Sequence, residues 1–155
     1  MSSTQNWFVH DHSQHEENLS RCKQAIKQED WDKASSIFEE FVTALKSHIV
    51  HEEEEVFPTY VALVKISHDP TRTLRAEHDR IISFLKDMQG FITTHDSVHG
   101  LECLQRLEDE ITKHEEKEEQ IFLPLAGYVL DAKFWETKGK PGSSSAFASG
   151  RSWDF

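Results

Sequence analysis

The sequence predicts an all-α fold: an up-down-up-down antiparallel four-helix bundle followed by a Gly/Ser-rich C-terminal tail. Apolar residues recur at alternating spacings of three and four along four segments, which is the pattern of helices that pack along a common seam. The connections between these segments are short, and short connections favour antiparallel neighbours. At 155 residues, the chain is long enough for one domain with a core and too short for two ordinary ones.

The first two helices occupy the N-terminal half of the predicted bundle. The first is expected from about Trp7 to Gln28, and the second begins near Asp32. Because proline has no amide hydrogen, Pro58 is expected to kink the second helix or to loosen its last turns. The apolar stripe of the second helix also contains two polar residues, and in order it reads Phe38, Phe41, Leu45, His48, Glu52 and Val56.

The third and fourth helices form the other half. Asp69 is expected to cap the third helix, with Pro70 at its first position. The fourth is expected from about Asp96 to Lys133. The third stripe is Leu74, His78, Ile81, Leu85, Met88 and Ile92. The fourth is Leu104, Leu107, Ile111, His114, Glu118, Ile121, Leu125 and Val129.

The bundle is expected to span residues 1–136 and the tail residues 137–155. Residues 138–152 are rich in glycine, serine and proline, a composition that favours a flexible segment. The alternative is that the aromatic residues Phe147, Trp153 and Phe155 dock onto the bundle or onto a neighbouring subunit.

Charge and composition exclude several classes of partner. A net charge of −11 argues against nucleic acid and anionic membrane, because both require a basic face. No apolar run approaches the roughly 20 residues that cross a bilayer, and residues 1–15 lack the pattern of a signal peptide. Cys22 and Cys103 lie in different segments among apolar residues, so we interpret them as small buried side chains rather than a disulfide. These features predict a soluble cytoplasmic protein, and they specify neither a protein partner nor an oligomeric state.

One sequence unit is used twice, at an offset of 66 residues. Its flanks keep their character, with Asp11 and Glu77 at corresponding positions. The identities are His12, His48, Glu52 and Pro58, which recur as His78, His114, Glu118 and Pro124. The repeat therefore preserves metal-binding residue types rather than bulk hydrophobicity. Four imidazoles and two carboxylates in a twofold arrangement predict two metal ions side by side.

The candidate ligands of the second and fourth helices lie within apolar stripes. An ionised carboxylate in a dry core costs several kcal/mol if it is unpaired. Coordination of a divalent or trivalent ion removes that cost. The nitrogen and oxygen donors suit iron or manganese better than a thiolate site would.

The chain has ten histidines, and the repeat distinguishes among them. An alternative ligand set lies three residues further on, at His15, His51 and Glu55. Carried forward by the repeat, it meets Ile81, Lys117 and Ile121, which cannot complete a symmetric site. The remaining histidines lie near predicted helix ends or loops and are interpreted as solvated: His10, His68, His95 and His99.

The doubled pattern of a histidine followed by H-x-x-x-E resembles the hemerythrin-like HHE domain over about residues 7–130. This resemblance implies a four-helix bundle around a non-haem di-iron centre. It implies that one iron is bound by His12 and His48, the other by His78 and His114, and both by the bridging Glu52 and Glu118. The implied cofactor is two iron ions, Fe2+ or Fe3+, bridged by oxide or hydroxide, with manganese or zinc as substitutes.

The chain departs from the oxygen-carrying hemerythrins at Leu74, where those proteins have a fifth histidine. Two octahedral ions have about twelve coordination positions, and the implied ligands with one bridging oxygen fill about ten. Each ion therefore keeps one open position. Glu115 is a further candidate metal ligand, because its repeat partner is the apolar Ile49. The alternative is that Glu115 points to solvent with its acidic neighbours.

An open metal position beside an apolar wall predicts a protein that binds or senses a small diatomic ligand, O2 or NO. The residues expected to form this wall are Phe8, Leu45, Leu74 and Ile111. The alternative is a di-iron enzyme or repair factor that handles NO or peroxide, or that supplies iron to iron–sulfur clusters. Binding is favoured over dedicated catalysis because no tyrosine, serine or extra acid is expected in the seam. A ferritin-type ferroxidase is disfavoured, since its Glu-x-x-His pairs are missing: no glutamate precedes a histidine by three residues.

Overall fold

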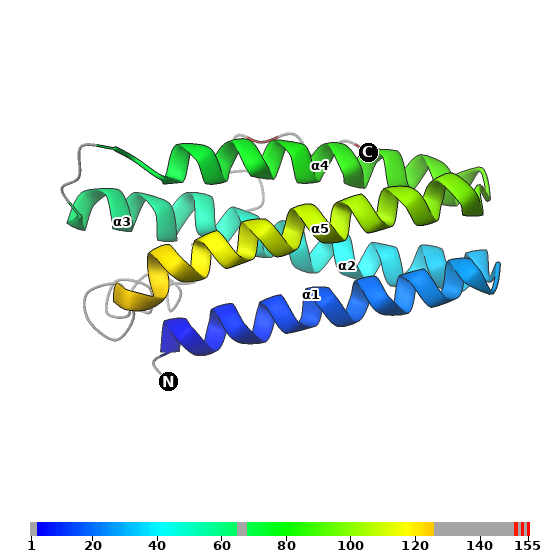
Figure 1. Ribbon diagram of the computed structural model, residues 1–155, viewed down its shortest axis with the longest axis horizontal. Coiled ribbons are helices and arrows are strands. Elements are labelled where there is room, and N and C mark those ends of the chain that lie inside the picture. The colour runs from blue at the N-terminus through cyan, green and yellow to red at the C-terminus, as the bar shows by residue number, and fades with distance from the viewer. Residues whose placement is uncertain (1–2, 65–67, 126–150, 152, 154) are drawn as a thin grey trace.

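The computed structural model describes residues 3–64, 68–125, 151, 153 and 155, with side chains from residue 10 onward. The described residues form an all-α four-helix bundle and contain no strand. Its helices alternate in direction, as predicted (Figure 1). The elements are α1 (Ser3–Lys27), α2 (Trp31–His51), the π-helical turn η1 (Glu52–Val56), α3 (Phe57–Leu63), α4 (Thr71–Thr93), α5 (Ser97–Phe122) and the 3-10 turn η2 (Leu123–Leu125).

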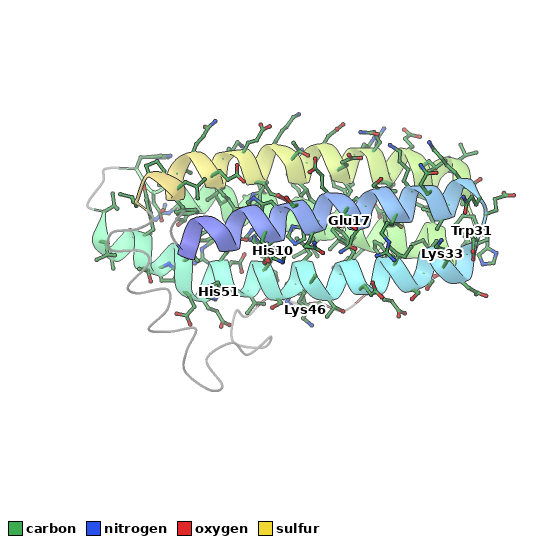
Figure 2. The ribbon with its side chains drawn as sticks, turned by 90° about the horizontal axis from the view of Figure 1, so that it is seen from below. His10, Glu17, Trp31, Lys33, Lys46 and His51 are labelled. Atoms are coloured by element: carbon green, nitrogen blue, oxygen red, sulfur yellow. The ribbon has the colours of Figure 1, made fainter. Side chains whose placement is uncertain are left out.

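Each long helix packs against two others, so that the bundle closes around one core. The helix α1 contacts α2 and α5, while α4 contacts α5 and α2. Figure 2 shows α1 lying between α2 and α5, with Trp31 and His51 near opposite ends of α2. Among the described residues, no helix is both long and apolar enough to cross a bilayer.

The 66-residue repeat extends to the loops that join α1 to α2 and α4 to α5. Glu29 and His95 occupy corresponding positions, and both have a left-handed backbone with φ of 54°. The next residues, Asp30 and Asp96, cap the following helices by accepting a hydrogen bond from the amide three residues on, at 3.2 and 3.0 Å. The two halves of the chain therefore share backbone geometry as well as candidate ligands.

The second predicted helix loosens where Pro58 disturbs it. Because Pro58 cannot donate a backbone hydrogen bond, the chain widens into η1, where the amide of Phe57 bonds to the carbonyl of Glu52. Pro58 then lies in the first turn of α3. The wider turn buries two consecutive acids, Glu52 and Glu53, which are 0% and 5% exposed. A regular helix would direct neighbouring side chains about 100° apart.

Two predicted boundaries need correction. The helix α4 begins at Thr71 rather than Pro70, although Asp69 does accept a hydrogen bond from the Thr71 amide at 2.9 Å. The helix α5 ends at Phe122 rather than Lys133, because Pro124 interrupts the backbone hydrogen bonds and the chain tightens into η2. Residues 126–133 of the predicted helix lie outside the described residues.

The candidate ligands form a layer between two apolar clusters. One cluster fills the bundle toward the α1–α2 and α4–α5 loops and includes Leu45, Ile81 and Ile111. The other lies toward α3 and consists of Val56, Phe57, Tyr60, Leu74 and Phe122. Along α5, for example, Ile111 of the first cluster precedes His114 and Glu118, and Phe122 of the second follows them. Cys22 and Cys103 are buried and free, in agreement with their interpretation as small core side chains.

Candidate metal centre

Six buried side chains from the four sides of the bundle meet in two overlapping groups. In the first, one ligand atom from each member lies within 4.8 Å of all the others; the members are Glu52, His78, His114 and Glu118. The second group meets the same criterion and consists of His12, His48 and Glu118. The structure thus brings together the six residues that the repeat singles out, and Glu118 belongs to both groups.

The histidines direct their Nε2 atoms inward. The Nε2 atoms of His78 and His114 lie 3.0 Å apart. Two nitrogen ligands at adjacent octahedral positions, each about 2.1 Å from a metal ion, would be separated by about 3.0 Å. The spacing of these two rings therefore fits a shared first-row metal ion.

The two central carboxylates also lack the hydrogen bonds that buried anions require. Among the described residues, neither oxygen of Glu52 or Glu118 accepts a hydrogen bond of acceptable geometry. His48 Nε2 lies 3.2 Å from Glu52 Oε1, and His114 Nε2 lies 3.3 Å from Glu118 Oε1. Both glutamates are 0% exposed, so a cation between them would satisfy oxygens that the protein leaves unsatisfied.

The two histidines of the His12–His48 pair differ in protonation. Burial lowers the pKa of His12 to about 4, which leaves a neutral ring with a lone pair for a metal. Burial also lowers the pKa of His48, but the carboxylates of Glu52 and Asp11 outweigh it and raise that pKa to about 10. In the metal-free protein, the protonated ring of His48 therefore partly neutralises Glu52.

A second layer of carboxylates fixes the outer nitrogens of the same rings. The distances from Nδ1 to the nearest carboxylate oxygen are 3.0 Å for His48–Asp11, 2.7 Å for His78–Glu53, 3.0 Å for His114–Glu77 and 2.9 Å for His12–Glu119. When Nδ1–H donates to a carboxylate, the lone pair of the neutral ring lies on Nε2, facing the centre. The four acids thus orient all four rings for coordination.

These outer acids follow the 66-residue repeat, since Asp11 corresponds to Glu77 and Glu53 to Glu119. From the sequence, the first pair was recognised only as similar flanks, and the second pair was given no role. The signal was available, because Glu53 and Glu119 are identical residues at the same offset as the ligands. Sequence alone did not show that their side chains reach across the bundle to the other half.

The geometry of this buried His/Glu cluster agrees with the comparison to known families. The family model described as the hemerythrin HHE cation binding domain matches residues 4–126. The chain belongs to the hemerythrin HHE family. No curated protein matches the chain, and neither does any solved structure. Family membership and the cluster together indicate a metal-binding protein.

In this HHE domain, Glu115 lies outside both ligand groups. One of its oxygens is 3.3 Å from Nδ1 of His12, and the other is 3.3 Å from Nδ1 of His15. It therefore contacts the outer side of the His12 ring, together with Glu119. It is partly buried rather than pointing freely into solvent, so neither sequence alternative describes its position fully.

His15, which the repeat argument set aside, is buried beside the centre of the HHE domain. Its ring is 2% exposed, and its centroid lies 5.1 Å from that of His48. His15 lies three residues after His12 and therefore on the same face of α1. This spacing is the signal in the sequence that could have identified His15. Its lack of a repeat partner makes the His12–His48 side of the site different from the His78–His114 side.

The expected apolar wall of the HHE domain is present for the residues whose side chains the structure describes. Leu45, Leu74 and Ile111 are all buried. The ring of Phe57 stacks on His78 with centroids 5.7 Å apart. The side chain of Phe8 lies outside the described residues. Leu74 is buried beside Phe57. An apolar side chain therefore occupies the position at which oxygen-carrying hemerythrins have their fifth histidine.

Proposed function

We propose that this HHE domain holds two iron ions and binds a small diatomic ligand, O2 or NO, at the ion held by His12 and His48. The observation that carries the proposal is the unequal size of the two ligand groups. Four side chains surround one position, whereas three surround the other. Ligand groups of this kind leave more coordination positions open on the His12–His48 side.

A cavity beside His12 supports the same location. It has a volume of about 240 Å³, lies between α1 and α5, and is lined by His12 and by mostly polar and acidic residues such as Glu115 and Glu119, with apolar surface from Leu19 and Ile111. Such a cavity admits a diatomic molecule, while the apolar clusters on both sides of the ligand layer limit the entry of water. Ferrous ions would supply the electrons that O2 or NO binding draws on, and the chain's own residues would hold the ions and exclude solvent.

The alternative, an enzyme that turns over NO or peroxide, is favoured by one observation. Buried His15 and partly buried Glu115 form a pair beside His48, with 3.3 Å between His15 Nδ1 and a Glu115 oxygen. A histidine paired with a carboxylate can hold a proton and deliver it to a reacting ligand. From the sequence, Glu115 was expected to be either a metal ligand or a solvated acid, and its pairing with His15 was not foreseen.

The visible spectrum of the iron-loaded protein distinguishes these functions. Protein loaded with Fe2+ without oxygen is exposed to O2 or to NO and then flushed with argon. A spectral change that reverses supports binding or sensing, whereas irreversible oxidation with repeated turnover supports the enzyme. The double variant Glu52→Ala/Glu118→Ala is the control. If wild type and this variant both show no spectral response to either gas, the proposed function is wrong.

A further inference from the structure

Arg151, four residues before the last residue Phe155, lies against η1 and α4, where its guanidinium group binds Glu53 through two hydrogen bonds. Its Nη2 donates to one Glu53 oxygen at 2.6 Å, and its Nε donates to the other at 3.2 Å. Nη1 donates to a carboxylate oxygen of Asp79. The side chain of Arg151 is only 15% exposed.

Glu53 connects this arginine to the candidate metal centre. The oxygen that accepts the hydrogen bond from Arg151 at 2.6 Å also lies 2.7 Å from Nδ1 of His78. Glu53 is 5% exposed, so these contacts lie in a region that water screens weakly. The result is a continuous chain of polar contacts from the end of the polypeptide to a candidate metal ligand.

Two other acids that contact the outer nitrogens of the candidate ligands, Glu77 and Glu119, have their charges stabilised in other ways. Glu77, which contacts His114, is paired with Lys117 from the bundle itself. Glu119, the repeat partner of Glu53, is 36% exposed, so water can solvate its charge. Glu53 is more deeply buried, and its two-pronged cationic contact comes from Arg151, whereas Arg75 approaches its carboxylate only to 4.0 Å. An arginine fork fixes the plane of a carboxylate, which a single point charge does not.

A second contact anchors the same end of the chain to α2. Trp153 packs against the larger apolar cluster, and the ammonium group of Lys46 lies 5.4 Å from its ring centroid. Figure 2 shows Lys46 on α2, the helix whose Val42 and Val50 line a cavity of about 410 Å³ together with Trp153 and Phe155. The C-terminal residues thus contact both α2 and α4, on either side of their shared seam.

We propose that Arg151 is a positioning residue for the metal centre: it fixes Glu53, and through Glu53 the ring of His78. Docking of the C-terminal residues and metal binding then strengthen each other. The coupling is reciprocal, because any factor by which docking tightens metal binding is also the factor by which metal binding tightens docking. This inference rests on the proposed function only in requiring that His78 binds a metal ion.

Metal affinity in Arg151 variants tests the positioning role. Competition between the full-length protein and a chelator for Fe2+, measured without oxygen, gives the affinity of each variant. Loss of an outer hydrogen-bonding partner typically weakens metal binding 10–100-fold, and we expect Arg151→Ala to weaken it about 10-fold. Arg151→Lys is expected to recover part of the loss, because it restores the charge without the fork.

The matched control is Arg106→Ala, which removes an arginine from an exposed pair with Glu102 and is expected to leave affinity unchanged. Equal Fe2+ affinity in Arg151→Ala and Arg106→Ala would overturn the proposal. So would an equal loss in Arg151→Ala and Arg151→Lys accompanied by lower melting temperatures of both metal-free variants, since that result indicates general destabilisation.

The reciprocal effect is measured on the wild-type protein. Amide hydrogen exchange of the peptide that contains residues 151–155 reports how often the end of the chain detaches. We expect exchange to slow about 10-fold on Fe2+ loading, the same factor as in the affinity measurement. Unchanged exchange would overturn the coupling. If wild type binds no Fe2+, the proposed function fails; if it binds Fe2+ but Arg151→Ala matches wild type, only this inference fails.

Discussion

The Nε2 atoms of His78 and His114 lie 3.0 Å apart, and each ring is held from the other side by a carboxylate on Nδ1. Two neighbouring helices therefore direct nitrogen ligands to one point in the core. Just beside this point, Glu52 and Glu118 are fully buried. Such an arrangement is stable only when its charges and lone pairs find partners.

Removing the metal is expected to destabilise the bundle. A ligand that binds only the folded state at a hundredfold excess over its dissociation constant stabilises that state by about 2.7 kcal/mol. For a chain of this size, each kcal/mol corresponds to about 2–4 °C, so we expect the melting temperature to fall by about 5–10 °C. Calorimetry of metal-free and iron-loaded protein measures the difference. Equal melting temperatures would mean that other groups satisfy the buried acids.

Glu77→Gln is expected to weaken metal binding, because it removes the charged acceptor that orients His114. Burial raises the pKa of Glu77, but hydrogen bonds from His114 and Lys117 outweigh it and lower that pKa to about 2. The carboxylate is thus ionised at neutral pH. We expect a 10–100-fold loss of Fe2+ affinity. The exposed Glu116→Gln is the matched control, and a similar affinity in both variants would contradict the role assigned to Glu77.

Glu115→Ala is expected to leave the number of exogenous ligands per centre unchanged. The carboxylate of Glu115 contacts Nδ1 of His12 and His15 and belongs to neither ligand group, so its removal opens no coordination position. Azide titration of iron-loaded wild type and Glu115→Ala, with Glu116→Ala as a surface control, measures the stoichiometry. A rise from about one to about two azide ions per centre would instead make Glu115 a metal ligand.

The thiol of Cys22 is expected to be unreactive in the folded protein. Burial raises its pKa from 9.0 to about 11. Iodoacetamide reacts with the thiolate, so at pH 8 labelling of Cys22 should be at least about 100-fold slower in folded than in unfolded protein. Mass spectrometry of labelled peptides measures both rates, and comparable rates would contradict the burial of this side chain.

The same raised pKa predicts the direction of an alkaline effect on stability. Between pH 9 and 11, the folded protein keeps the Cys22 proton whereas the unfolded chain releases it. The free energy of unfolding therefore falls as pH rises through this window, by up to about 3 kcal/mol. Denaturant titrations of wild type and Cys22→Ala across this range isolate the contribution of the thiol.

Much of the fold could be predicted because helix periodicity and the repeat agree. The stripes in α2, α4 and α5 place His48, His78 and His114 on the core-facing sides of their helices without any knowledge of the structure. The end of α5 was missed because periodicity continues past Phe122, whereas Pro124 ends the regular helix. The spacing of apolar residues carries no information about backbone hydrogen bonds, so it does not show that proline lacks an amide hydrogen.

The outer layer of the site was harder to predict, since it depends on contacts between distant segments. Glu53 and His78 belong to different halves of the chain, and the contact forms because η1 turns Glu53 inward. Arg151 approaches Glu53 from the far end of the sequence. The domain boundary at residues 136 and 137 remains a prediction, because residues 126–150 lie outside the described part of the chain.

The metal content of the protein tests the central claim most directly. Wild-type protein purified after iron supplementation and analysed by elemental mass spectrometry is expected to contain about two iron ions per chain, as the two ligand groups imply. The double variant Glu52→Ala/Glu118→Ala, which removes the central carboxylates, is expected to contain almost none. Wild type with metal content near zero, or a double variant that retains the wild-type content, would contradict the account.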